Sequence, residues 1–266
     1  MTTNSSERLC RWSHDAGARG YRESESDSPI LPGVPQALAH DLQAMASAQA
    51  YNDWLIARAR PWLRGRVLDV GAGIGTHTAQ LRPLADEVVA LEPDPKFAQM
   101  LRERVEGVQI IEGDATAVQG QFDAIVCFNV LEHIRDDEGT LRRFRELLAP
   151  DGALLLLVPA HPFLYGKIDD AFGHERRYAK EELGQKLRRA GLEPEVLRHV
   201  NPVGALGWLA QARIRKRARM SYRGLDLYDR LVPALRLLDK VPLPVGLSLW
   251  AVAKTSGTAS ANARNA

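Results

Sequence analysis

Along the middle of the chain, short apolar stretches alternate with segments in which apolar residues recur every three or four positions. The short stretches predict buried strands, and the periodic segments predict amphipathic helices between them. This alternation is typical of an α/β fold, with a parallel sheet covered by helices on both faces. The expected strands span 66–72, 87–92, 108–113, 122–129 and 152–159, and the expected helices span 76–84, 95–105 and 139–148.

The segments on either side of this core have different patterns. A helical pattern covers 36–63, where Pro61 marks its end. We expect one domain over 33–254 between two disordered tails, 1–32 and 255–266, because both tails are polar and lack apolar periodicity. After the fifth strand we expect a long polar loop, a helix closed by Gly191, a sixth strand, a helical cap insertion and a last strand, at 160–178, 179–190, 193–200, 202–240 and 247–254.

The composition narrows the class of protein. The chain has 266 residues, of which 45% are apolar, enough for one sizeable α/β domain. No apolar run approaches the roughly 18–20 residues of a membrane-spanning helix, and the N-terminus lacks the apolar core of a signal peptide. Cys10 lies in a polar tail and Cys127 in an apolar strand pattern, so we expect no disulfide between them. A reducing, cytoplasmic location follows from that expectation.

The stretch 67–76, VLDVGAGIGT, combines a buried strand, a glycine turn and the start of a helix. Glycines at Gly71, Gly73 and Gly75 let the backbone approach a ligand without clashes of a Cβ atom. The free N–H groups of a helix start favour polar or anionic groups. Thr76 stands where a dinucleotide-binding motif has its third glycine. The alternative interpretation is a tight turn that binds no ligand.

Polar residues follow the next strands, and in open parallel sheets ligands bind beyond these carboxyl ends. Glu92 ends the second strand and is placed to accept hydrogen bonds from both hydroxyls of a ribose, although it could also be a solvated loop acid. Asp114 follows the third strand and suits an exocyclic amine, which suggests adenine. Asn129 and the residues at 130–133 add an amide, a carboxylate and an imidazole at the reacting end of the ligand.

In this order, VLDVGAGIGT, VVALEPDP, EGDAT and FDAIVCFNVLEHI resemble the successive motifs of class I S-adenosylmethionine-dependent methyltransferases. LLAPDGALLLLVPA resembles the fifth-strand motif of that family, and the likeness extends from about residue 51 to 254. The resemblance implies a Rossmann-like, doubly wound seven-stranded sheet whose last strand is antiparallel and inserted next to the fifth. The segments VPAHPFLYGKIDDAFGHERRY and VPLPVGLSLWAVAK resemble a type 11/12-like bacterial subgroup that has no uniform acceptor.

The resemblance also implies the cofactor S-adenosyl-L-methionine and the residues that hold it. The glycine loop would lie under its methionine part, and Glu92 would hold its ribose. Asp69 would orient the loop or reach the amino group of the cofactor, and Tyr51 would cap the cofactor from the N-terminal helix. The full expected set is Tyr51, Asp69, Gly71, Ala72, Gly73, Gly75, Glu92, Pro93, Asp114, Ala115, Asn129 and Val130.

Methyl transfer from a sulfonium depends mainly on proximity and alignment, and a base is needed only where the acceptor must lose a proton. His133 is the first candidate base, and its alternative role is a structural imidazole bonded to a backbone carbonyl. His174 and Asp169 are further catalytic candidates, and we expect His133 to act nearer to the chemistry than His174. We expect no metal, because these residues lack fixed ligand spacing and the chain has no cysteine pair.

The loop 160–178 is long and polar, which is typical of functional loops. Arginine pairs suit planar oxyanions, so the loop is expected to bind an anionic or carboxylated acceptor. The alternative is a set of internal salt bridges that only orders the loop. The expected substrate-binding residues are His161, Tyr165, Arg176, Arg177, Tyr178 and, from the insertion, Trp208.

The insertion contains several basic residues between 213 and 223 and no acid among them. Three interpretations of these residues stay open: a solvated face, a contact with an anionic substrate, and a peripheral contact with a membrane surface. Nucleic acid is not expected, because the formal net charge of the chain is only +2 and no RNA-binding module is present. The oligomeric state is not indicated by these patterns.

The motifs therefore predict a methyltransferase that moves the methyl group of S-adenosyl-L-methionine to O or N of a small-molecule acceptor by in-line displacement. Two alternatives stay open at this point. One is methylation of a lipid-linked or nucleic-acid acceptor, in which the basic insertion would take part. The other is a protein that binds the cofactor without catalysis and serves as the partner subunit of another enzyme.

Overall fold

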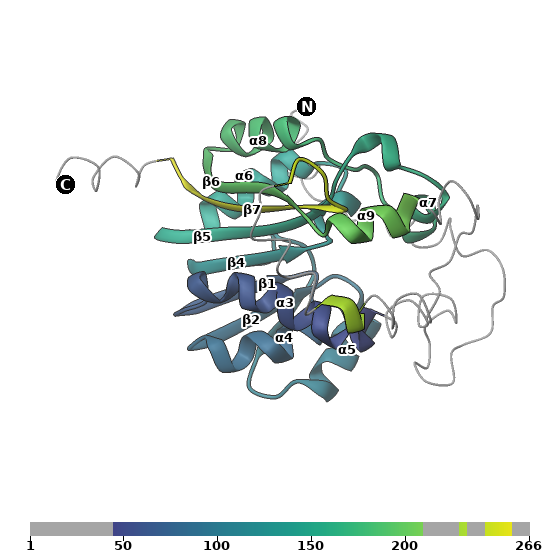
Figure 1. Cartoon of the computed structure of the whole chain (residues 1–266). Helices are drawn as coiled ribbons and strands as arrows, with labels where there is room; N and C mark the ends of the chain where they lie inside the picture. Colours follow the sequence, from purple (N-terminus) through teal and green to yellow (C-terminus); the bar gives the residue numbers. More distant parts are fainter. Residues whose placement is uncertain (1–44, 210–228, 233–242, 257–266) are drawn as a thin grey trace, which may run out of the picture.

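A computed structural model describes residues 45–209, 229–232 and 243–256 (Figure 1). Its centre is a seven-stranded sheet with the strand order β3-β2-β1-β4-β5-β7-β6. The pairs among β1 to β5 are parallel, whereas β7 runs antiparallel to both β5 and β6, which confirms the expected fold class. The strands are β1 (Arg66–Val70), β2 (Glu87–Glu92), β3 (Gln109–Glu112), β4 (Phe122–Phe128), β5 (Leu148–Pro159), β6 (Leu192–Val200) and β7 (Ser248–Thr255).

Helices cover both faces of this sheet. One face packs against α3 (Gln49–Ala59), α4 (Thr76–Leu81) and α5 (Pro95–Arg104), and the other packs against α6 (Asp137–Leu147) and α8 (Lys180–Arg189). The shorter elements are η2 (Arg60–Trp62), η3 (Arg82–Leu84), η4 (Leu131–His133), η5 (Pro162–Leu164), α7 (Lys167–Phe172) and α9 (Pro202–Leu209).

The central strands are mostly apolar, and both of their faces are covered. Val67 packs with the residues of α3, whereas its neighbour Leu68 packs with those of α6 and α8, and both side chains are fully buried. Ile125 and Val126 on β4 divide between the two faces in the same way. Parallel strands buried on both faces read as continuous apolar runs, which is why they could be located from the sequence.

Most element boundaries differ from the prediction by one or two residues, and three differences concern the segments around the sheet edge and the C-terminus. The loop expected over 160–178 contains the short helix α7, and its two ends are pinned together, since Tyr178 N donates to Pro159 O at 2.9 Å. β5 begins at Leu148 rather than at 152. The tail expected from 255 begins later, because Thr255 is the last residue of β7 and Ser256 N donates to Gly191 O at 3.1 Å. Long-range backbone hydrogen bonds of this kind have no local sequence signal.

The insertion between β6 and β7 leaves and re-enters the sheet at one place, where Leu247 N donates to Asn201 O at 3.0 Å. Its described parts are α9 and a helical stretch at 229–232. That stretch packs on α3, where the Asp229 carboxylate accepts from Ala50 N at 3.1 Å and Tyr51 N at 2.8 Å. The basic residues of the insertion, Cys10 and the predicted N-terminal tail lie outside the described residues. Within the described part of the chain, no helix combines the length and apolarity needed to cross a membrane.

Candidate active site

The glycine loop joins β1 to α4 with left-handed backbone at Gly71, Gly73 and Gly75, whose φ angles are +67°, +57° and +87°. A Cβ on Gly71 would come within 2.5 Å of Val130 Cγ2, and one on Gly75 within 2.6 Å of Leu101 Cδ1. Around Gly73 no atom of the described residues, apart from its chain neighbours, lies within 4 Å of such a position. Gly71 and Gly75 therefore serve close packing, while Gly73 faces open space that a ligand can approach.

Glu92 connects the end of β2 to this loop. Its Oε2 accepts from Gly73 N at 2.7 Å, and its Oε1 accepts from Asp94 N at 3.0 Å. The residue is buried, and burial raises the pKa of its carboxyl to about 7. Asp114 differs, because it is only half-buried and its Oδ1 accepts from the backbone N of Thr116 at 2.8 Å. The two acids thus lie at the carboxyl ends of neighbouring strands, as the sequence predicted.

Asp69 lies in β1 just before the loop and ties that strand to α4. Thr78 Oγ1 donates to Asp69 Oδ2 at 2.6 Å, and Asp69 is buried. Burial raises the pKa of its carboxyl to about 7, although the Thr78 hydrogen bond acts in the opposite direction. Tyr51, on α3, is nearly buried and packs against Trp54 with ring centroids 5.5 Å apart. Its expected role as a cofactor cap stays a prediction.

Unusual backbone marks the same edge of the sheet at three non-glycine residues. Asn129 follows β4 with φ +53°, His161 comes just after β5 with φ +62°, and Asn201 follows β6 with φ +61°. These three strands are parallel to one another, so their ends lie on one side of the sheet. Left-handed backbone at non-glycine residues is costly and concentrates at functional sites. The remaining expected cofactor residues, Ala72, Pro93, Ala115 and Val130, lie in the loops at this edge.

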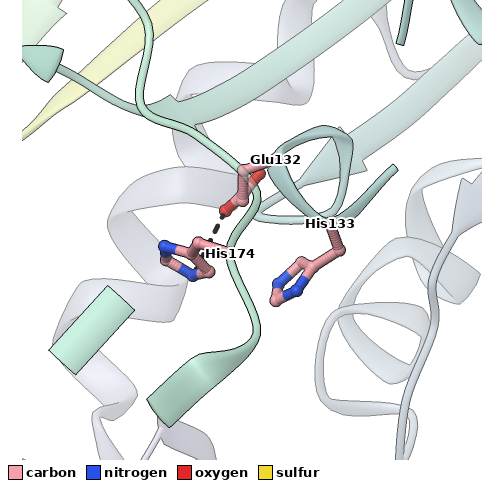
Figure 2. A group of neighbouring side chains, drawn as sticks. All are labelled: Glu132, His133 and His174. Atoms are coloured by element: carbon pink, nitrogen blue, oxygen red, sulfur yellow. Dashed lines mark ion pairs between the residues drawn. The ribbon is translucent and has the colours of Figure 1, made fainter. Parts of the chain in front are cut away.

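A cluster of three side chains, Glu132, His133 and His174, follows β4 (Figure 2). Glu132 and His133 come from η4, and His174 comes from the segment after α7. The two segments are tied by Glu175 N, which donates to Glu132 O at 2.8 Å. The potential ligand atoms of the three side chains all lie within 4.8 Å of one another, and the two imidazole rings meet edge to face at 4.8 Å.

Glu132 is fully buried, and among the described residues neither of its carboxylate oxygens accepts a hydrogen bond from another residue. His174 Nε2 lies 4.0 Å from Glu132 Oε1. Burial raises the pKa of the Glu132 carboxyl to about 7, and the nearby His174 acts against this rise. A buried carboxylate without a donor is costly, so its retention points to a functional partner.

The two imidazoles of the cluster are each fixed through Nδ1. His133 Nδ1 lies 3.2 Å from Gly173 O, and because a carbonyl only accepts, Nδ1 carries the proton. His174 Nδ1 lies 2.8 Å from Asp169 Oδ1. Burial, with a smaller contribution from His174, lowers the pKa of His133 to about 3, so that ring is neutral. In His174 this leaves Nε2 on the side of Glu132.

Asp169 is itself held by Arg177, whose Nε donates to Asp169 Oδ1 at 2.8 Å and whose second donor reaches Ala160 O at 3.2 Å. Both side chains are buried. Burial alone would raise the pKa of the Asp169 carboxyl, but hydrogen bonds from His174 and Arg177 outweigh it and hold the pKa below its ordinary value. The expectation that Arg177 anchors the substrate needs correction, because its guanidinium points into the protein and positions Asp169.

Arg176 and Tyr178 are also engaged inside the protein. Arg176 donates to Ile134 O at 2.8 Å and pairs with Asp137 at 3.0 Å. Tyr178 is fully buried, and its hydroxyl donates to Asp137 Oδ2 at 2.9 Å. These contacts fasten the segment 160–178 to the start of α6. They favour internal salt bridges, the alternative interpretation of this loop, over a set of acceptor anchors.

The other expected substrate residues have mixed positions. His161 is half-buried and stacks on His199 with ring centroids 4.7 Å apart. Tyr165 is exposed, and its hydroxyl donates to Asp170 Oδ1 and His174 O, both at 2.8 Å. Trp208 belongs to α9, but its side chain lies outside the described part of the structure. The sequence interpretation gave no catalytic role to Glu132, although the acid in the LEH run was a visible signal.

This combination of a seven-stranded sheet with an antiparallel β7, a glycine loop and acids at successive strand ends defines a class I S-adenosylmethionine-dependent methyltransferase. Residues 36–212 match the model of the methyltransferase domain family, and the chain belongs to that family. The protein is therefore an enzyme whose cofactor is S-adenosylmethionine. The loop geometry fits this cofactor, because Gly73 faces open space and Glu92 presents a buried carboxylate beside it.

Named relatives agree with this classification. A ubiquinone biosynthesis O-methyltransferase of Xanthomonas axonopodis pv. citri (strain 306) is 28% identical over 191 residues, which cover 64% of this chain and 78% of the relative. The DhpI–SAH complex has a TM-score of 0.55 at 18% identity, covering 84% of this chain and 92% of that one. A S-adenosylmethionine-dependent methyltransferase from Clostridium acetobutylicum ATCC 824 has a TM-score of 0.55 at 13% identity, covering 83% and 98%. At these identities the two structures show the fold alone.

Proposed function

We propose that this enzyme methylates a hydroxyl oxygen of a small-molecule acceptor. The observation that carries the proposal is the cluster of Glu132, His133 and His174, which begins two residues after Val130, the residue packed on Gly71 of the cofactor loop. A hydroxyl must lose its proton as its oxygen is methylated, so it needs such groups next to the cofactor. A neutral amine already presents a lone pair and has less need of them. The O-methyltransferase name of the Xanthomonas relative supports the choice of oxygen.

When bound, S-adenosylmethionine supplies a methyl group on a positively charged sulfur. The acceptor oxygen would take this methyl group as the carbon–sulfur bond breaks with its electron pair left on sulfur, and the hydroxyl proton would leave on the side of the cluster. In this proposal the glycine loop and Glu92 hold the cofactor, and His133 and His174 act on the hydroxyl. Asp169 is a positioning residue, since it fixes the ring of His174 through Nδ1.

The proposal extends to the setting of the reaction. A small, unattached acceptor and a cytoplasmic enzyme without nucleic-acid partners agree with the near balance of charge over the whole chain. His161 and Tyr165, which precede His174 in the segment 160–178, stay proposed contacts of the acceptor. Trp208 of α9 is a further proposed contact. A lipid-linked acceptor is the main competing substrate class, because the basic insertion could meet its anionic part.

A turnover screen with purified full-length protein tests the proposal. The enzyme is incubated with S-adenosylmethionine and matched panels of phenols, aliphatic alcohols, amines and lipid-linked alcohols, and release of S-adenosylhomocysteine is measured. We expect turnover with hydroxyl compounds, and mass spectrometry with NMR should show a new O-methyl group. Turnover confined to amines would contradict the choice of oxygen. Turnover confined to lipid-linked alcohols would contradict the choice of a free small molecule.

A further inference from the structure

We propose that Glu132, His133 and His174 form a binding site for one divalent transition-metal ion. The three side chains converge from two segments, η4 and the end of the α7 loop, and Figure 2 shows Glu132 and the two rings facing one shared space. The expectation of no metal was based on spacing along the chain. The structure adds an arrangement that spacing alone could not reveal.

The donor set suits such an ion. Two imidazoles and one carboxylate are the ligand combination of many first-row transition-metal sites, and sites of this type leave coordination positions open. With metal–ligand bonds of about 2.0–2.2 Å, two ligand atoms of one ion lie roughly 3–4 Å apart. His174 Nε2 and Glu132 Oε1 are 4.0 Å apart, and all three potential ligand atoms lie within 4.8 Å of one another. Small side-chain rotations are enough to complete the site.

The partners of the two rings also match a metal site. Imidazoles that bind a metal almost always donate their other ring N–H to a carboxylate or a backbone carbonyl. His174 uses Nδ1 toward Asp169 Oδ1 at 2.8 Å, and His133 uses Nδ1 toward Gly173 O at 3.2 Å. Asp169 is anchored in turn by Arg177 at 2.8 Å. His174 therefore presents Nε2 toward Glu132 Oε1, 4.0 Å away, and the His133 ring lies edge to face beside it.

Glu132 supplies an independent observation. Its side chain is fully buried, and within the described residues both of its oxygens lack a hydrogen-bond partner. A cation bound between Glu132 and the imidazoles would provide the missing partner. Imidazole ligands favour Zn²⁺, Fe²⁺, Co²⁺ or Ni²⁺ over Mg²⁺ and Ca²⁺, which prefer oxygen ligands. The chemistry thus indicates a transition metal.

Binding of the ion is independent of the proposed function. Its role in the reaction deepens that function and rests on it. A divalent cation polarises an oxygen atom near it and lowers the pKa of a hydroxyl. An open coordination position at the end of β4 suits the hydroxyl oxygen of the acceptor, beside the place where Val130 packs on Gly71 of the glycine loop. With its pKa lowered, the acceptor hydroxyl would release its proton to water more readily.

Cobalt titration of the tag-free full chain tests the site, since Co²⁺ in a mixed nitrogen–oxygen site gives visible absorption bands. We expect one equivalent of Co²⁺ to bind after chelator treatment and dialysis. Glu132→Gln and His174→Ala should each weaken binding by at least about tenfold, and Asp169→Asn by about 10–100-fold. His199→Ala is the matched control, because it removes an imidazole outside the cluster and should leave cobalt affinity unchanged.

Absence of saturable cobalt binding, or binding that survives in both Glu132→Gln and His174→Ala, would overturn the site. A Zn²⁺ titration of the unmodified protein avoids variants that fail to fold, because imidazole ¹⁵N NMR signals of two histidines should shift together at one equivalent. Unchanged imidazole signals would also overturn the proposal. Measurements of turnover separate the role of the ion from the proposed O-methylation. Equal rates with and without bound metal contradict the role of the ion, while absent O-methylation despite metal binding contradicts the proposed function alone.

Discussion

The cofactor side and the acceptor side of the sheet edge are held together in different ways. On the cofactor side, carboxylates accept from backbone or hydroxyl groups 9 to 19 residues away, as in Asp69 with Thr78 and Glu92 with Gly73. On the acceptor side, charged groups join segments 41 to 49 residues apart, as in the hydrogen bond of Tyr178 and the ion pair of Lys186 with Asp137. Neutral donors from neighbouring elements shape the cofactor loop, whereas longer-range contacts that include ion pairs fasten the segment 160–178 onto the same sheet edge.

The acids of the two sides differ in electrostatics as well. Burial raises the pKa of Asp69 and Glu92 to about 7, and among the described residues no cation offsets this rise. Burial also acts on Asp137 and Asp169, but lysine or arginine neighbours outweigh it and hold their pKa values below the ordinary range. Glu132 lies on the acceptor side yet resembles the first pair. A buried acid without an internal cation is therefore the better marker of a ligand position in this protein.

The largest expected effect comes from His133→Ala, which should lower kcat by ~10²–10⁴ with little change in the affinity for S-adenosylhomocysteine. His174→Ala should act in the same direction with a smaller loss, because its ring meets that of His133 edge to face in the same cluster. Steady-state kinetics and calorimetry measure the two quantities. A loss of cofactor affinity as large as the loss of kcat would show that the histidine cluster also serves cofactor binding, which contradicts the division into a cofactor side and an acceptor side. The expected order, with His133 nearer to the chemistry, is tested by the same kinetics.

Arg177→Met should lower the free energy of unfolding by about 3–5 kcal/mol, because it leaves Asp169 buried without its cation. Denaturant unfolding followed by circular dichroism measures this change. The double variant with Asp169→Asn is the matched control and should lose less stability, since no buried charge is left unpaired. Unchanged stability with a raised acceptor KM would instead restore Arg177 as a substrate anchor.

Asp69→Asn should remove a pH dependence of stability. The folded protein binds the Asp69 proton with a pKa of about 7, against 3.8 as the ordinary value, so the unfolded chain releases it first as the pH rises. Through Asp69 the wild type then loses roughly 2–4 kcal/mol of stability between about pH 4 and 7. The variant loses less by this amount, while Glu92 and Glu132 still contribute over the same pH range. Glu92 and Cys127 interact with Asp69, so unfolding curves are compared across pH for both proteins. If the stability of the two proteins changed equally with pH, the raised pKa of Asp69 would be contradicted.

Glu92→Ala should weaken the binding of S-adenosylhomocysteine by about 1–3 kcal/mol, the cost of leaving polar partners without an acceptor. Isothermal titration calorimetry measures the affinity. Glu112→Ala is the matched control, because Glu112 is an exposed acid at the end of the neighbouring strand. Equal affinities for Glu92→Ala and the wild type would remove Glu92 from the cofactor site.

The smallest expected effect is that of Asp229→Ala, which removes the carboxylate that accepts from Ala50 N and Tyr51 N. Stability should fall by about 1 kcal/mol, as for the loss of a helix cap. Thermal unfolding measures the change. A wild-type melting curve would show that the contact between the insertion and α3 contributes no net stability.

The fold and the cofactor side could be predicted because their signals are local. Apolar periodicity located the strands, and Glu92 and Asp114 followed directly from the rule that ligands meet the carboxyl ends of parallel strands. The acceptor side could not be predicted in the same way. Nothing near His174 in the sequence shows that it meets Glu132, and the direction of the Arg177 guanidinium depends on Asp169 and Ala160. An arginine that binds an acid within the protein and one that binds an acid in a substrate have the same sequence signal.

The hydrogen bond between Leu247 N and Asn201 O has a consequence for engineering. It closes the two ends of the segment 202–246 onto one point of the sheet. Changing the length of a closed loop costs little conformational entropy, about 0.6 kcal/mol for each doubling. The segment can therefore be exchanged as a cassette between enzymes that share the Asn201–Leu247 closure. Transplanting it should transfer acceptor preference while the recipient keeps its own cofactor loop.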